Sequence, residues 1–503
     1  MIRRTYWWIS CSLGLALCAI VSGTPAFSAT LVCDPDELTN AVSRAVPGSE
    51  IVLCDRVWKD TEINISVRAT ASNPVRITAQ TPGDVVLTGA SAVLMSGSFV
   101  IVDGLVFTGN YTGEKSPVEF RNAAGDCNDC RLTNSAFIDF NAADPTFYRA
   151  WVSIAGRRNL VDHNYFSGKT HRGPLVAVSR GDDPTPDDAR IEYNYFSRPP
   201  VGAENNGESV QVGQQAPGTL SNAVVSRNYF FEADGELEAI SIKASEVTVI
   251  GNTIESSQGT ITLRQGSNNR VEGNFILGNG RSMTGGIRVI GPGHVVANNY
   301  ISDIDPDGIP VRGAIVLHSG ESNDPIAKYT AVRDALVANN TIVNAGRSIL
   351  AGEGADTMMP EDVVVANNIV WGASGPLIAN ARSLVNPRFL NNIFFGASSG
   401  LAADAGQILL DPRLKPDAVG LWRPAADSPA RGAGAPIPNV TVDILQRDRI
   451  EPYDIGAFNV GTTPGPISRP LGRCDVGPMT FDPDGSDCIG VSRPKPPEQL
   501  TRQ

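Results

Sequence analysis

The sequence predicts an all-β protein: a right-handed parallel β-helix, which is a single-stranded solenoid, with an N-terminal capping helix and a loop-rich C-terminal region. Three observations lead to this prediction. A short phrase recurs along most of the chain, a helical pattern precedes its first copy, and Pro- and Gly-rich segments follow its last copy. Each coil of such a solenoid consists of three short strands, and insertions loop outward from the coils.

Residues 1–28 have the pattern of a signal peptide. Arg3 and Arg4 precede an apolar run, and the small residues before Ala29 are suited to cleavage. No later stretch is long and apolar enough to span a bilayer. We therefore expect a secreted or periplasmic protein in which residues 29–503 form one β-helix domain.

The first element of this domain is expected to be a short helix that begins near Asp34, in the segment DPDELTNAV. Asp at the N-cap and Pro in the first turn are both typical of a helix start. Such a helix can cover the open edge of the first coil, which would otherwise invite strand addition from another chain.

The repeat follows, with the pattern apolar-x-x-Asn-apolar-apolar. Its asparagines are Asn164, Asn194, Asn228, Asn252, Asn274, Asn299, Asn340, Asn368 and Asn392. The shortest spacing is 22 residues, which suits one β-helix coil with insertions of variable length. An asparagine tolerates left-handed backbone geometry at a corner, and it can bond the amides of neighbouring coils in a ladder. A leucine-rich repeat would need a leucine spacing that is missing here, and a propeller would need longer, more even periods.

After about residue 410 the repeat fades, so we expect residues 410–503 to form a C-terminal cover. Six cysteines remain after the signal peptide, as the sequence-local pairs Cys33/Cys54, Cys127/Cys130 and Cys474/Cys488. An even count in an exported chain favours disulfides, although the sequence leaves the pairing open. A redox or zinc site is the alternative for Cys127/Cys130, but no histidine or second pair lies near them in the sequence.

The formal net charge of the chain is −12, and it becomes −14 once Arg3 and Arg4 leave with the signal peptide. This excess of acidic residues argues against nucleic acid as a partner. A polyanionic ligand would need a local cationic cleft or a bound metal ion.

The segment GELEAISIK, residues 235–243, does not fit one straight strand. Glu236 and Glu238 share a face, but the apolar alternation loses its phase near Ala239. We interpret the phase change as a corner between two sheets, with both glutamates on the adjoining face. Two carboxylates at this spacing can converge as hard oxygen ligands for calcium, and Asn206 can lend an amide oxygen from the preceding coil.

Three basic residues precede successive copies of the recurring asparagine by 9, 10 and 11 residues: Lys243, Arg264 and Arg288. Their apolar neighbours are expected to point inward, so the charges point outward. Because coils stack about 4.8 Å apart, the three residues should form a cationic ladder on one sheet face. Outward charges are usually only solvated, but stacked like charges repel, and nothing in the fold requires them.

These segments resemble polysaccharide lyase family six, the chondroitinase B and alginate lyase family. The similar segments are WVSIAGRRNLVDHNYFSGKTHRGP from Trp151, NNGESVQVG from Asn205, GELEAISIK from Gly235, GTITLRQGSNNRVEGNFILGNG from Gly259 and RGAIVLHSG from Arg312. The resemblance covers nearly the whole chain after the signal peptide. It implies a right-handed parallel β-helix that cleaves uronate-containing polysaccharides by β-elimination.

The resemblance also implies roles for individual residues. Lys243 matches the Brønsted base of the family, and Arg264 matches its catalytic arginine. The calcium ligands correspond to Asn206, Glu236 and Glu238, and substrate contacts are expected from Arg288, Arg312, Gln265 and His318. Many relatives have His directly after the catalytic arginine, whereas Gln265 stands there in this sequence and cannot transfer a proton.

The chemistry is consistent with these roles. Removing the C5 proton of a uronate builds negative charge on its carboxylate, and a bound cation stabilises that charge. Lys243 must be uncharged to accept the proton, and neighbouring cations favour the uncharged amine. The sequence therefore predicts a secreted, calcium-assisted lyase for an anionic uronate polysaccharide, with alginate favoured over dermatan sulfate, and no organic cofactor is needed.

Two other classes stay open. A non-catalytic glycan-binding β-helix would bind polysaccharide without turnover. A pectin-type hydrolase would need clustered aspartates, and the pairs Asp182-Asp183 and Asp187-Asp188 lie in a Pro-rich insertion typical of a solvated loop. The uronate linkage, internal or terminal attack, periplasmic or extracellular location and the oligomeric state are open from the sequence.

Overall fold

The structure is a computed structural model, and it describes residues 29–180, 185–200, 206–213, 218–324, 329–354, 357–403, 406–459 and 469–489. The expected signal peptide, residues 1–28, lies outside the described residues. The longest helix among them has nine residues, and none is of the length and hydrophobicity that a membrane crossing requires.

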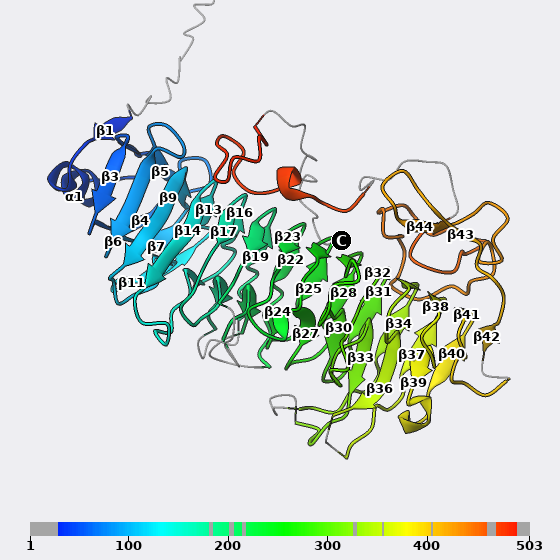
Figure 1. Cartoon of the computed structure of the whole chain (residues 1–503). Helices are drawn as coiled ribbons and strands as arrows, with labels where there is room; N and C mark the ends of the chain where they lie inside the picture. Colours follow the sequence, from blue (N-terminus) through cyan, green and yellow to red (C-terminus); the bar gives the residue numbers. More distant parts are fainter. Residues whose placement is uncertain are drawn as a thin grey trace, which may run out of the picture.

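The described chain winds into a parallel β-helix in which successive coils add one strand to each of three long sheets (Figure 1). This confirms the predicted fold class. Sheet A consists of β1 (Thr30–Val32), β2 (Glu50–Leu53), β5 (Val75–Ala79), β8 (Val100–Asp103), β13 (Arg131–Thr133), β16 (Leu160–Asp162), β19 (Arg190–Glu192), β22 (Val224–Ser226), β25 (Thr248–Ile250), β28 (Arg270–Glu272), β31 (Val295–Ala297), β34 (Leu336–Ala338), β37 (Val364–Ala366) and β40 (Arg388–Leu390).

Sheet B consists of β3 (Arg56–Lys59), β6 (Val85–Gly89), β9 (Leu105–Tyr111), β14 (Ala136–Ala142), β17 (Tyr165–Ser167), β20 (Tyr195–Ser197), β23 (Tyr229–Phe231), β26 (Thr253–Glu255), β29 (Phe275–Leu277), β32 (Tyr300–Ser302), β35 (Thr341–Val343), β38 (Ile369–Gly372), β41 (Asn392–Gly396) and β42 (Gln407–Ile408). Sheet C consists of β4 (Glu62–Arg68), β7 (Ala92–Ser98), β10 (Val118–Glu119), β11 (Arg121–Asn122), β12 (Gly125–Asn128), β15 (Val152–Ile154), β18 (Val176–Val178), β21 (Val210–Val212), β24 (Glu238–Ile242), β27 (Thr260–Leu263), β30 (Ile287–Val289), β33 (Ile315–His318), β36 (Ile349–Glu353) and β39 (Ile378–Ala379).

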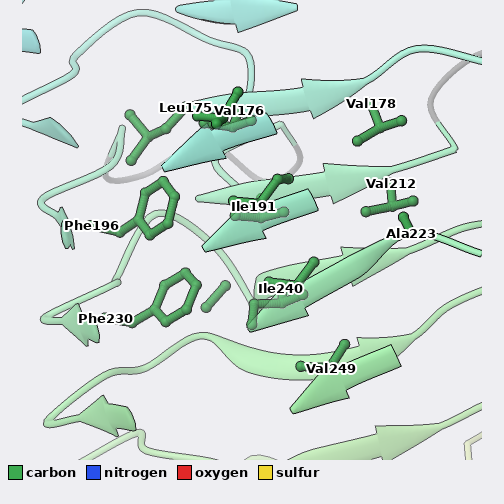
Figure 2. Close-up of a cluster of buried hydrophobic side chains, with 14 of the residues drawn as sticks. Leu175, Val176, Val178, Ile191, Phe196, Val212, Ala223, Phe230, Ile240 and Val249 are labelled. Carbon is green, nitrogen blue, oxygen red and sulfur yellow. The ribbon is translucent and has the colours of Figure 1, made fainter. Parts of the chain in front are cut away.

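The core lies between the three sheets and consists of columns of stacked side chains. One column contains Phe107, Phe137, Phe166, Phe196 and Phe230, with successive ring centroids 4.4 to 5.1 Å apart. That interval matches the strand spacing of about 4.8 Å, so identical residues in register stack face to face. Figure 2 shows Phe196 and Phe230 in this column beside the aliphatic residues of the neighbouring sheets.

The recurring asparagines form the predicted ladder along one buried corner. From Asn164 to Asn392, the Nδ2 of each donates to the Oδ1 of the next at 2.9 or 3.0 Å. The left-handed residue is not the asparagine itself, as expected, but the residue before it, such as His163 (φ 54°) or Tyr193 (φ 53°). The preceding residue makes the turn, so the asparagine side chain can point inward and bond its neighbours.

The expected N-terminal helix is α1 (Pro35–Ser43), and it packs at the first coil (Figure 1). The carboxylate of Asp34 accepts hydrogen bonds from the backbone amides of Asp36 and Glu37 at 2.9 Å, which caps the helix. Leu38 is buried in the main core and anchors the helix there.

The described part of the C-terminal region is mostly loop, with one hairpin, β43 (Leu414–Pro416) and β44 (Trp422–Pro424), and one short 3₁₀ helix, η2 (Arg473–Asp475). A second 3₁₀ helix, η1 (Ala381–Ser383), connects β39 to β40 within the β-helix. The C-terminal region packs on the outer side of sheet B in two places. Ile444, Ile455 and Phe458 pack with Phe275 and Tyr300, and Val476 packs with the tyrosines of β17, β20 and β23. The three expected cysteine pairs are all disulfides: Cys33–Cys54, Cys127–Cys130 and Cys474–Cys488.

Candidate active site

The segment 235–243 changes phase through a β-bulge. β24 and β27 pair in parallel, and their register shifts between Glu238 and Ile240. Ala239 and Ile240 are consecutive and both buried. The predicted corner between two sheets is therefore wrong: one extra residue within a single strand resets the alternation. As a result Glu238 and Lys243 both belong to the outer side of sheet C.

The predicted cationic ladder is correct for two of its three members. Lys243 follows Ile242, Arg264 follows Leu263, and these apolar residues are partners in register. Arg288 instead pairs with Thr262, two positions earlier in the register than Arg264. We predicted the register of Arg288 from its distance in sequence to the recurring asparagine. This prediction was wrong because the connections between sheet C and the asparagine corner differ in length from coil to coil.

Three carboxylates gather beside these cations. The oxygens of Glu208, Glu236 and Glu238 lie within 4.8 Å of one another. Glu208 was not among the predicted ligands, which included Asn206 from the same segment. Its position could have been found by pairing β21 with β24: Val210 lies opposite Ile240, which places Glu208 level with Glu238.

The acidic cluster is largely buried, and its carboxylates repel one another. Glu208 is only 2% exposed, and its Oε2 accepts no hydrogen bond from the described residues. Burial, followed by the charges of Glu208 and Glu238, raises the pKa of Glu236 to about 9. Two buried carboxylates and one half-buried carboxylate, with an unsatisfied oxygen on Glu208, fit a hard divalent cation that would bind these oxygens and offset their repulsion. The side chains present therefore fit calcium.

Three cationic side chains surround the cluster. Nζ of Lys243 lies 3.5 Å from Glu208 Oε1, and the Oε1 of Glu238 lies 3.6 Å from Arg264 Nε and 3.3 Å from Arg288 Nη1. The side chains of Lys243 and Arg264 are 25% and 14% exposed, so solvent reaches both. Arg288 is buried, and this burial lowers its pKa, although Glu238 opposes the shift.

The remaining predicted site residues lie around this centre. Asn206 lies at a bend with φ 74°, and its backbone oxygen accepts a hydrogen bond from the Gly173 amide at 2.8 Å. Arg312 is buried, donates through Nη1 to the Met283 carbonyl, and its pKa is lowered by burial. Gln265 directly follows Arg264 and is half-buried.

His318 is buried rather than exposed to the cleft. It ends β33, and its Nδ1 lies 2.9 Å from the carbonyl oxygen of Ser319. Its ring stacks on Tyr329, with centroids 5.0 Å apart and planes 14° from parallel. Tyr329 also lies over the Arg264 guanidinium at 4.4 Å. Tyr329 was missed because it lies in the long insertion before β34, where no strand pattern places it.

The paired aspartates do not form a hydrolase site among the described residues. Asp187, expected in a solvated loop, is 2% exposed and forms an ion pair with Arg180 at 3.2 Å. Its carboxylate also accepts a hydrogen bond from Ser221 at 2.6 Å, so it serves to hold the turn between coils. Asp182 and Asp183 lie outside the described residues.

Comparisons with known proteins agree with the resemblance in sequence. The family model described as chondroitinase B matches residues 32–400. The family six alginate lyase AlyGC is 28% identical with a TM-score of 0.78, over 90% of this chain and 59% of that one. A family six polysaccharide lyase from Pseudopedobacter saltans is 26% identical with a TM-score of 0.63, over 75% of this chain and 95% of that one.

A third solved structure is similar in fold. It is a mannuronic acid specific family 6 lyase from human gut microbiota, 24% identical with a TM-score of 0.69, over 78% of this chain and 92% of that one. The chain thus spans 59% of the length of AlyGC and most of the length of the other two. No curated protein matches the sequence.

Proposed function

Because the chain belongs to the chondroitinase B family, which is polysaccharide lyase family six, we propose that it cleaves a uronate-containing polysaccharide by β-elimination. One observation carries the proposal: Lys243, Arg264 and the acidic cluster lie together on neighbouring strands of one sheet face. A glycan-binding surface without catalysis would not require a partly exposed amine beside carboxylates and a guanidinium.

Lys243 is the proposed base. Its amine takes the proton from C5 of the uronate, a double bond forms between C4 and C5, and the bond from C4 to the leaving oxygen breaks. Arg264 faces the same space and stabilises the negative charge that develops on the sugar. As the proposed catalytic arginine, Arg264 also helps to deliver a proton to the C4 oxygen, which then leaves as a hydroxyl group.

Glu208, Glu236 and Glu238 are the proposed calcium ligands, together with Asn206 from the sequence pattern. A bound calcium ion would stabilise the charge on the uronate carboxylate and make the C5 proton more acidic. Support comes from the unsatisfied Oε2 of Glu208 and the raised pKa of Glu236. Both indicate that the three carboxylates do not coexist as bare anions.

The residues proposed to contact the substrate differ in their exposure to solvent. Arg288 and Arg312 are buried cations, Arg288 lies 3.3 Å from Glu238 and Arg312 lies near Arg288, so both are proposed to hold the uronate carboxylate. Gln265 is half-buried next to Arg264 and can contact the sugar hydroxyls. His318 is stacked behind Tyr329, so its proposed contribution to substrate binding is indirect.

Alginate is the proposed substrate, because AlyGC, which is similar to this chain over 90% of its length, is a family six alginate lyase. Dermatan sulfate is the second candidate, because the family model is described by chondroitinase B. Secretion to the periplasm or the medium remains our proposal, and it rests on the signal-like residues 1–28.

The test is to incubate the protein with alginate and calcium and to follow the ultraviolet absorbance of the unsaturated uronate product. We expect a rise for the wild type and none for Lys243→Ala. Dermatan sulfate and chondroitin sulfate are tested in parallel, and defined alginate blocks show which linkage is cut. No rise on any of the three polysaccharides would reject the lyase function, and binding without turnover would favour a glycan-binding protein.

A further inference from the structure

The Tyr329 ring contacts two planar groups at the edge of the proposed active site: it stacks on the His318 imidazole, and the Arg264 guanidinium lies over it. The ring centroid of Tyr329 lies 4.4 Å from Arg264 Cζ and 5.0 Å from the His318 centroid. Leu263 pairs with Val289, and Val289 pairs with Leu317, so Leu263 and Leu317 occupy the same register position two coils apart. Arg264 and His318, which directly follow them, are therefore also in register. Two coils leave about 9.6 Å, the space that one aromatic ring fills between two planar groups.

The residue between them in register is Ile290, an aliphatic side chain that cannot bridge the two groups. Tyr329 comes from the insertion between β33 and β34, and backbone contacts fix its position. Its amide donates to Glu321 Oε1 at 3.2 Å, and its carbonyl accepts from the Glu321 amide at 2.8 Å. The next residue, Thr330, is buried, and its carbonyl accepts from the amide of Gly291 at 3.1 Å. The ring is thereby tied to the coil that lies between Arg264 and His318.

We propose that Tyr329 is a positioning residue that holds the guanidinium of Arg264 in the orientation needed for catalysis, an inference that rests on the proposed lyase function. The face of a tyrosine attracts a guanidinium and restricts it to the plane of the stack. In this plane Arg264 keeps its Nε 3.6 Å from Glu238 Oε1.

His318 supports the stack from the other side. The carbonyl of Ser319 accepts a hydrogen bond at 2.9 Å, so Nδ1 carries the donating proton and the imidazole is fixed in rotation. His318 is 3% exposed, which keeps it from the sugar. It acts on catalysis through Tyr329, and this explains a buried histidine at the end of a strand beside the active site.

The role of the ring can be separated from a role of the hydroxyl. If stacking is the contribution of Tyr329, Tyr329→Phe keeps it and Tyr329→Leu removes it. If the hydroxyl instead donates a proton to the leaving oxygen, Tyr329→Phe is as impaired as Tyr329→Leu. The two outcomes are exclusive, and only the first supports the proposal.

The experiment measures kcat and KM on alginate with calcium for the wild type and four variants. We expect Tyr329→Phe to match the wild type and Tyr329→Leu to lose roughly 10- to 100-fold in kcat with little change in KM. His318→Ala should lower kcat in the same direction by less. Phe458→Leu is the matched control, since it removes the ring that faces Arg423 at 4.7 Å on the sheet B side and should leave kcat unchanged.

A second readout does not depend on activity. Phenylglyoxal modifies accessible arginines, and peptide mass spectrometry reports the rate at Arg264. We expect faster modification of Arg264 in Tyr329→Leu than in the wild type and Tyr329→Phe, with equal thermal unfolding midpoints as the control for folding. Equal rates in all three proteins would overturn the positioning role even if the wild type proved to be no lyase. A wild type that is inactive but shows the expected rates would reject the lyase function alone.

Discussion

Glu208 is the residue on which the acidic cluster depends most. It is the most buried of the three carboxylates, with one oxygen 2.7 Å from Gln211 Nε2 and the other unsatisfied by the described residues. The first oxygen also lies 3.5 Å from Lys243 Nζ. A buried carboxylate oxygen that accepts no hydrogen bond costs free energy. A bound cation would offset that cost for the second oxygen.

We therefore predict opposite effects of Glu208→Gln on stability and on metal binding. The calcium-free variant should be more stable than the calcium-free wild type, because one of three mutually repelling charges is removed. Calcium affinity, measured by calorimetry on the calcium-free protein, should fall by about tenfold or more. Glu246→Gln is the control, since Glu246 is exposed and follows β24 on the neighbouring coil. A loss of stability with unchanged calcium affinity would contradict a metal-binding role for Glu208.

At the scale of elements, the asparagine ladder holds the coils in register. Asn274 donates from Nδ2 to Asn299 Oδ1 and to the Val249 carbonyl, both at 3.0 Å, and it accepts from Asn252. All of these groups are buried, so a missing side chain leaves donors and acceptors unpaired on both neighbouring coils.

Asn274→Ala should lower the free energy of unfolding by about 3 kcal/mol, since each unpaired buried group costs roughly 1–3 kcal/mol. Urea denaturation followed by circular dichroism measures this change. Asn64→Ala, in the exposed row of β4, should cost less than about 0.5 kcal/mol. Equal losses in both variants would mean that the ladder does not stabilise the coils beyond an ordinary surface contact.

The sequence was informative where an element repeats and uninformative where one coil differs from the next. The asparagine ladder and the capping helix follow from local patterns, and the structure has them where expected. The bulge at Ala239 was detected as a loss of phase, but its form depends on pairing with β27. The register of Arg288 relative to Arg264, and that of Glu208 relative to Glu238, depend on the lengths of the connections between sheets. The position of Tyr329 depends on the path of the insertion between β33 and β34, and a periodic sequence pattern does not predict that path.

At the scale of the molecule, the two outer faces of the solenoid are used differently. The C-terminal region packs on the outer side of sheet B, where it buries the tyrosines of β17, β20 and β23 (Figure 1). The proposed active site lies on the outer side of sheet C, at β21, β24, β27 and β30 in the middle of the solenoid. The proposed polysaccharide substrate can therefore lie along sheet C without displacing the C-terminal region.

Buried histidines make the stability of the whole molecule sensitive to acid. Burial lowers the pKa of His294 from 6.5 to about 4 and that of His171 to about 3. The unfolded chain takes up protons at these residues below pH 6.5, whereas the folded protein does not. Stability is therefore complete above pH 6.5 and falls as the pH drops towards 4, by up to about 3 kcal/mol for His294.

His294→Gln should flatten this dependence. Gln can still accept from the Asn269 amide, which donates to His294 Nδ1 at 3.1 Å, but it does not titrate. The variant should be less stable than the wild type at pH 7.5, and the difference should shrink as the pH falls from 6.5 to 5, above the range where most carboxylates titrate. The comparison is made as a difference between the two proteins, because Glu236, whose pKa is raised, contributes a pH dependence of the opposite sign to both. A difference in unfolding free energy that stays constant between pH 7.5 and 5 would show that His294 does not carry the acid sensitivity.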